Sequence, residues 1–156
     1  MEYIVAIIDD DTKICSILSS VLKSKFTNIK INIYNEPTVG EKTSDIYFVD
    51  NFFGGEEKLN FLLGEIKGIN PDALVIAMSG NLDEETVRGL NDSGCDIVWG
   101  KMWVDNENIL SIISKYMKSR ENIAELNDTN VSNVSNVSTA SKVFKKVKKL
   151  VLRNSV

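Results

Sequence analysis

Residues 3–11 read YIVAIIDDD, a continuous apolar run that ends in three aspartates. A run rich in β-branched residues is typical of a strand that is covered on both faces, as in a parallel sheet. The next stretch, residues 12–24, has apolar residues at helical spacing, so one side of a helix could pack on such a sheet. This strand and helix set the expectation of an α/β fold.

The same alternation continues to about residue 126. Only about ten residues, 36–45, separate the second predicted strand from the third, and they include Pro37 and Gly40, so we expect only a weak helix of one or two turns there. Five strands alternating with helices predict a parallel sheet with helices on both faces. The remaining strands are predicted over residues 30–34, 46–49, 73–78 and 95–99, and the remaining helices over 59–66, 83–93 and 106–126.

Four of the predicted strands are followed by a reactive side chain. Asp9 and Asp10 follow the first strand, Asp50 follows the third and Ser79 the fourth, and Lys101 lies two residues past the fifth. A single aspartate at such a place more often caps a helix, so the interpretation depends on the joint occurrence. The carboxyl ends of parallel strands line the crevice where ligands bind in open α/β sheets. We therefore expect these side chains to meet in one pocket.

These residue types suit phosphoryl transfer. Three carboxylates close together raise one another's pKa values, and a bound cation relieves that conflict. Oxygen ligands without histidine or thiolate favour Mg²⁺. Lys101 adds a positive charge and Ser79 adds a hydroxyl donor, as a phosphoryl group with charged oxygens needs. The set predicts phosphoryl transfer to a carboxylate nucleophile, which forms an acyl phosphate.

The order of these motifs resembles the receiver domain of response regulators in two-component signalling. The resemblance covers about residues 2–120 and implies a doubly wound, flavodoxin-like fold, with a five-stranded parallel sheet in the order 2-1-3-4-5. The motifs that carry it are Ile7-Ile8-Asp9-Asp10-Asp11, Phe48-Val49-Asp50, Ala77-Met78-Ser79-Gly80, and Gly94-Cys95-Asp96 leading to Lys101.

The resemblance also implies a role for each polar residue at the strand ends. Asp50 would accept the phosphoryl group, Lys101 would contact it, and Ser79 would be the switch hydroxyl. The ligands of Mg²⁺ would be three carboxylates and one main-chain carbonyl, from Asp9, Asp10, Asp50 and Phe52.

The resemblance implies a phosphorelay function. Such a domain takes its phosphoryl group from a histidine kinase or phosphotransfer protein and signals to a downstream effector protein. It has no classical turnover, but it catalyses its own phosphorylation and dephosphorylation. The alternative is a receiver-like module that binds a protein partner without being phosphorylated.

Three positions depart from the usual pattern of that family. Met102 follows the lysine where the family usually has proline, so we expect a differently built loop. Gly54 stands where a proline commonly follows the phosphoacceptor, and Gly54 with Gly55 should loosen that loop. Val98 replaces the usual aromatic residue, and strand alternation should point the neighbouring Trp99 to the opposite face of the sheet.

Two other classes of protein fit the sequence less well. A phosphatase motif of the form Asp-x-Asp-x-Thr nearly matches residues 9–13, but Lys13 stands where the threonine is needed. Nucleotide binding is disfavoured because no Gly-x-Gly-x-x-Gly or Gly-Lys-Ser/Thr loop follows a predicted strand.

The sequence changes character after residue 126. Residues 127–141 contain the tripeptide Asn-Val-Ser three times, and such small polar residues predict a flexible, disordered linker. Residues 142–156 place valine and leucine at helical spacing between lysines, which predicts a basic amphipathic helix. We expect a receiver domain over 1–126, then the linker, then this basic tail. The tail could solubilise the chain, bind an anionic membrane surface, or dock in a groove on a partner or on the acidic body itself.

Charge and cysteine content restrict the partners and the compartment. The chain has a net charge of −4 although six basic residues and no acidic one follow Thr139, so the body is acidic. An acidic body disfavours binding of nucleic acid, which needs a positive surface. Cys15 and Cys95 lie in apolar runs and predict unpaired thiols in a reducing compartment. The run at 3–8 is too short for a signal-peptide core, and no apolar stretch approaches the ~18 residues of a membrane span. We expect a cytoplasmic protein.

Overall fold

The computed structural model describes residues 1–103 and 107–129. Of these, residues 2–103 belong to one compact unit and helix α4 (Glu107–Thr129) to another, so each is described by itself. The elements of the first unit are β1 (Tyr3–Ile8), α1 (Thr12–Lys25), β2 (Ile29–Tyr34), β3 (Ile46–Asp50), β4 (Phe52–Phe53), β5 (Glu56–Glu57), α2 (Leu59–Ile69), β6 (Leu74–Ser79), α3 (Glu84–Asp92), β7 (Ile97–Gly100) and the 3₁₀ turn η1 (Lys101–Trp103).

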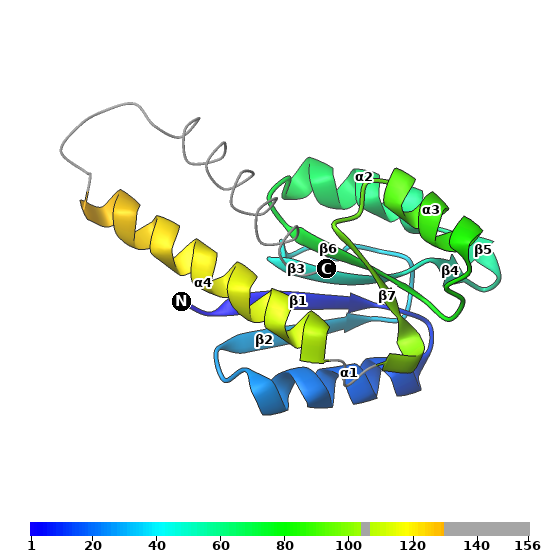
Figure 1. Ribbon diagram of the computed structural model, residues 1–156, viewed down its shortest axis with the longest axis horizontal. Helices are drawn as coiled ribbons and strands as arrows, with labels where there is room; N and C mark the ends of the chain where they lie inside the picture. The colour runs from blue at the N-terminus through cyan, green and yellow to red at the C-terminus, as the bar shows by residue number, and fades with distance from the viewer. Residues whose placement is uncertain (104–106, 130–156) are drawn as a thin grey trace. The chain divides into compact units, whose positions relative to one another are not determined.

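A five-stranded sheet forms the centre of this unit, with strand order β2-β1-β3-β6-β7 (Figure 1). Every neighbouring pair of its strands is parallel. Counted along the chain, these five strands have the order 2-1-3-4-5. The predicted doubly wound, flavodoxin-like sheet is therefore confirmed.

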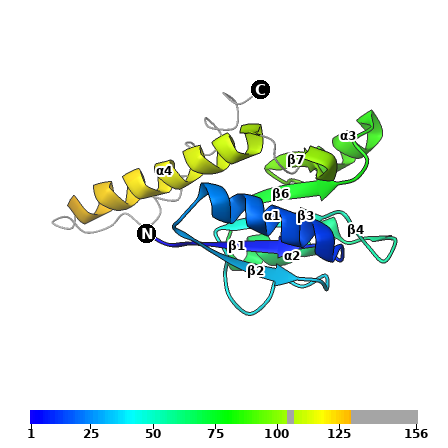
Figure 2. The ribbon, with the colours of Figure 1, turned by 90° about the horizontal axis from the view of Figure 1, so that it is seen from below.

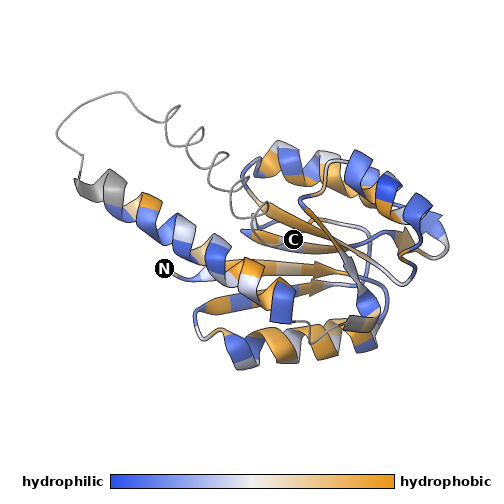
Figure 3. Cartoon of the chain, viewed as in Figure 1, coloured by the Kyte–Doolittle hydropathy of each residue, from blue (hydrophilic) through white to orange (hydrophobic). Residues whose placement is uncertain are grey.

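The three central strands of the sheet, β1, β3 and β6, are buried, and helices lie on both faces. Ala6, Ile8, Tyr47 and Val49 on one face belong to a single apolar cluster with buried residues of α2 and α3. Helix α1 lies on the opposite face, where it contacts β1 and β2 (Figure 2). Hydropathy follows this arrangement: the strands are mainly apolar, whereas α1 and α2 each carry apolar and polar residues on different sides (Figure 3). The alternation of one strand and one helix thus predicted the layers correctly.

The third aspartate of the first motif begins helix α1. The Asp11 carboxylate accepts hydrogen bonds from the N–H groups of Lys13 at 2.9 Å and Ile14 at 3.3 Å, which otherwise have no partner in the first turn. Asp11 is therefore an N-cap, and it leaves Asp9 and Asp10 for other interactions.

The connection between β2 and β3, residues 35–45, contains no helix, so the expectation of one or two helical turns was wrong. Gly40 has φ +71°, which a right-handed helix cannot include, and a Cβ atom there would overlap the ring of Tyr34. Val39 is buried in the apolar cluster that α2 also joins. The chain therefore covers this corner with an irregular loop that has one buried apolar anchor.

A small antiparallel hairpin, β4–β5, follows Asp50 and was not predicted. Its strands pair Phe52 with Glu57 and Phe53 with Glu56. The two residues between them, Gly54 and Gly55, have φ values of +57° and +86°, as a two-residue type I′ turn requires. The glycines therefore build a tight turn, whereas we expected them to loosen the loop.

Helix α4 extends three residues beyond the predicted end at residue 126. The rest of the predicted linker (127–141) and the basic tail (142–156) lie outside the described residues, so the division into domains stays a prediction. Among the described helices, none combines the length and apolar character that a membrane span needs.

Candidate functional site

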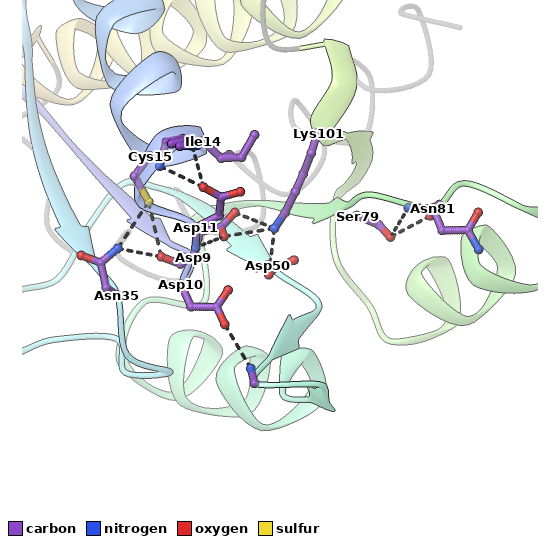
Figure 4. Close-up of polar contacts among 12 residues, drawn as sticks. Asp9, Asp10, Asp11, Ile14, Cys15, Asn35, Asp50, Ser79, Asn81 and Lys101 are labelled. Atoms are coloured by element: carbon purple, nitrogen blue, oxygen red, sulfur yellow. Dashed lines mark hydrogen bonds and ion pairs between the residues drawn. The ribbon is translucent and has the colours of Figure 1, made fainter.

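Three of the predicted site residues are joined by ion pairs at the carboxyl edge of the sheet (Figure 4). Ile8 of β1 pairs with Val49 of β3, so Asp9 and Asp50 leave adjacent strands at the same level. The Lys101 Nζ atom lies 2.9 and 3.0 Å from the two carboxylate oxygens of Asp9 and 2.8 Å from Asp50 Oδ2. Lys101 therefore bridges two carboxylates that belong to different strands.

Asp10 completes an acidic group with Asp9 and Asp50. One carboxylate oxygen from each of the three residues lies within 4.8 Å of the others. Asp9 and Asp50 are buried, whereas Asp10 is exposed and its Oδ2 atom accepts a hydrogen bond from the Gly54 N–H at 3.0 Å. The three residues offer oxygen ligands alone, which fits a hard divalent cation such as Mg²⁺.

The pKa values of Asp50 and Lys101 are both raised, for different reasons. Burial raises the pKa of Asp50 above its ordinary value, more than the hydrogen bond from Lys101 lowers it, and the charge of Asp9 raises it further. Burial alone would lower the pKa of Lys101, but its hydrogen bonds to Asp50 and Asp9 more than offset this and hold that pKa above its usual range. Lys101 is therefore charged at neutral pH. One ammonium among three carboxylates leaves room for a further positive charge.

Ser79 ends β6 at the same edge, but its hydroxyl has another partner. Its Oγ atom donates to the Asn81 carbonyl at 2.7 Å and accepts from the Asn81 N–H at 3.2 Å. Figure 4 shows Ser79 and Asn81 paired with each other and apart from the Lys101 ammonium. Serine hydroxyls often bond the main chain two residues on, which explains this orientation. The role of Ser79 as a switch hydroxyl stays a prediction.

Phe52 lies at the start of β4, directly beside the acidic group. Its N–H donates a hydrogen bond to the Asp50 carboxylate, which partly offsets the rise in the pKa of Asp50. The Phe52 side chain is 44% exposed. The proposed contact of the Phe52 carbonyl with a cation stays a prediction.

Solved structures of receiver domains resemble this chain in fold. The BeF3-activated receiver domain of DrrB from Thermotoga maritima matches with a TM-score of 0.66 and 20% identity, over 76% of this chain and 99% of that domain. This chain spans 54% of a longer DrrB chain. The receiver domain of a DNA-binding response regulator from Colwellia psychrerythraea matches with a TM-score of 0.59 and 24% identity, over 80% of this chain and 99% of that one.

The chain has the receiver fold. A third similar structure is the Mn²⁺-bound form of a response regulator, with a TM-score of 0.56 and 13% identity over 66% of this chain and 89% of that one. No protein-family model and no curated protein matches the sequence.

Within this receiver fold, the last strand has the predicted orientation. Val98 packs against the cluster shared with α2 and α3. Trp99 contacts Phe48 edge to face, with ring centroids 5.9 Å apart and planes at 68°, and strand alternation places Phe48 on the other face from Tyr47. The expectation that Trp99 points away from the face of Val98 is confirmed. The Lys101–Met102 peptide bond is trans, and these residues form the turn η1.

Sequence reasoning missed two side chains that hold the main chain of Asp9. Asn35, after β2, donates its amide to the Asp9 carbonyl at 2.9 Å, and the Cys15 thiol donates to the same oxygen at 3.4 Å. Burial, with the negative charges of Asp9 and Asp11, raises the pKa of Cys15 to about 11, so the thiol stays neutral. Cys15 and Cys95 are both unpaired in the structure, as predicted. A lone asparagine 26 residues from its partner gives no sequence signal.

Proposed function

We propose that this chain is a receiver domain of a two-component signalling system, in which Asp50 accepts a phosphoryl group while Mg²⁺ is bound. The observation that carries the proposal is the bridge of Lys101 between Asp9 and Asp50, with Asp10 completing the acidic group beside it. A surface cluster of acids would be solvated, whereas here two carboxylates are buried at the strand ends of a receiver fold.

The proposed reaction transfers a phosphoryl group to one oxygen of Asp50. That oxygen forms a bond to phosphorus as the bond from phosphorus to the donor breaks, and the bonding electrons leave with the donor. Lys101 lies close enough to Asp50 to stabilise negative charge on the phosphoryl oxygens. Asp9, Asp10 and Asp50 would hold Mg²⁺, with the Phe52 carbonyl, and the cation would neutralise charge that builds up during the transfer.

The partners follow from this chemistry. The donor would be a phosphohistidine on a histidine kinase or phosphotransfer protein, and the receiver would then act on a downstream effector protein in the cytoplasm. Ser79 would serve as the switch hydroxyl, which requires that it exchange its hydrogen bond to Asn81 for one to the phosphoryl group. The alternative, a receiver-like module that binds a protein without being phosphorylated, would need no phosphoryl donor.

Small-molecule phosphorylation tests the proposal directly. We expect the purified chain to gain the mass of one phosphoryl group with acetyl phosphate and Mg²⁺, and to gain none when EDTA replaces Mg²⁺. Intact-protein mass spectrometry measures both. If Mg²⁺ supports no labelling by acetyl phosphate or by a panel of sensor kinases, the receiver function is wrong and the unphosphorylated module becomes the better hypothesis.

A further inference from the structure

The hairpin β4–β5 contacts the acidic group through Gly54. Its N–H donates to Asp10 Oδ2 at 3.0 Å, between residues 44 positions apart. Lys101 holds the carboxylates of Asp9 and Asp50, but Asp10 is exposed and its described carboxylate contact is this one hydrogen bond. The orientation of the third carboxylate therefore depends on a main-chain donor in the hairpin.

The hairpin is built to hold that donor in place. Gly54 has φ +57°, a conformation that is open to glycine and strained for most other residues. The Lys58 N–H donates to the Asn51 carbonyl at 3.0 Å and closes the base of the hairpin. A proline at position 54 would have no N–H to donate, and its φ near −65° would not fit the turn. The glycine therefore supplies both the turn and the hydrogen bond.

We propose that Gly54 is a positioning residue for Asp10 in the binding of a divalent cation, an inference that rests on the proposed Mg²⁺-dependent function. The N–H of Gly54 holds one carboxylate oxygen of Asp10, so this carboxylate is already fixed beside Asp9 and Asp50 before the cation arrives. Groups that orient a metal ligand in this way contribute to affinity without touching the metal. Binding of the cation and ordering of the hairpin are then coupled, and the coupling acts equally in both directions.

Two substitutions at position 54 test whether its N–H and its turn conformation together support Mg²⁺ binding. Gly54→Pro removes the donor and does not fit the turn, so we expect Mg²⁺ affinity to fall about tenfold, as for other residues that orient metal ligands. Gly54→Asn keeps the N–H, and asparagine tolerates positive φ, so the Mg²⁺ affinity of this variant should stay within about twofold of the original. Isothermal titration with Mg²⁺ measures both, and circular dichroism shows whether each variant is folded.

Amide hydrogen exchange in the unaltered chain gives a second measurement that needs no variant. If the contact raises Mg²⁺ affinity tenfold, saturating Mg²⁺ must stabilise the contact equally, so exchange of the Gly54 N–H should slow about tenfold. The inference is overturned if the chain binds Mg²⁺ but exchange at Gly54 is unchanged, or if the folded proline variant binds as tightly as the original. A chain that binds no Mg²⁺ at all would overturn the proposed function as well, so the two failures are distinguishable.

Discussion

Asp50→Asn should abolish the Mg²⁺-dependent gain of a phosphoryl group. The amide of asparagine has nearly the shape of the carboxylate, but it lacks the anionic oxygen that attacks phosphorus. Its oxygen can still accept from Lys101, so the fold should persist. We would measure labelling by intact mass after reaction with acetyl phosphate and Mg²⁺, and locate the group in the unaltered chain by peptide mapping.

Asp11→Asn is the matched control for this substitution. Asp11 belongs to the same run of aspartates but caps α1, and asparagine caps a helix about as well as aspartate. Labelling should therefore stay at the original level. Full labelling of Asp50→Asn, or equal loss in both variants, would contradict the assignment of Asp50 as the phosphoacceptor.

The same Asp50 variant should be more stable than the original at neutral pH in the absence of Mg²⁺. Burial raises the pKa of Asp50, so the folded state binds this proton more tightly than the unfolded state does. The charged carboxylate consequently destabilises the fold above its folded pKa. The advantage of asparagine should shrink as the pH falls through that pKa and vanish below the unfolded pKa. Urea unfolding at several pH values measures the difference.

Lys101→Met should lower the free energy of unfolding by about 3 kcal/mol in Mg²⁺-free solution, because it leaves two buried carboxylates without their cation. Methionine keeps the length and most of the apolar volume of the side chain, so the loss reports the charge. Chemical unfolding monitored by circular dichroism gives the value. Added Mg²⁺ should restore part of the stability, because a bound cation replaces the missing charge.

Lys58→Met provides the comparison for a surface ion pair. Lys58 pairs with Glu56, which is largely exposed, and water screens such pairs so that they contribute little to stability. The effect of this substitution should therefore be small and indifferent to Mg²⁺. If the Lys101 variant lost no more stability than the Lys58 variant, Lys101 would not stabilise the buried carboxylates of Asp9 and Asp50 as the geometry indicates.

The sequence predicted the structure well where hydrophobic periodicity defines a strand or where a residue directly follows a strand. The strands around Ile7, Phe48 and Ile76 were predictable because they are buried on both faces and contain little else than apolar residues. Their parallel pairing then placed Asp9 and Asp50 at one edge. The lysine that joins them was predictable only as a member of the motif, since its long side chain reaches across β6.

Other features depend on contacts that no local pattern encodes. Strands of two residues, as in β4–β5, are too short to show alternation, so Gly54 and Gly55 indicated a loose loop when they form a tight turn. The position of Ser79 was predictable, but its choice of Asn81 as partner is a matter of side-chain rotation. The contact of Gly54 with Asp10 joins two distant segments and could be found only in the folded chain.

The irregular connection between β2 and β3, residues 35–45, should unfold locally more easily than the rest of the sheet, and we call this part of the sheet its corner. Val39 is its buried anchor, whereas α2 contributes four buried residues to the same layer. Opening this corner and the outer strand β2 exposes little apolar surface, so they should open without unfolding the whole sheet. Fast amide hydrogen exchange in these residues would show it. Insertions are tolerated best in such segments. Beyond Asn35, which holds the Asp9 carbonyl, the chain can therefore vary in length and sequence at this corner while the strand ends that carry Asp9 and Asp50 stay fixed.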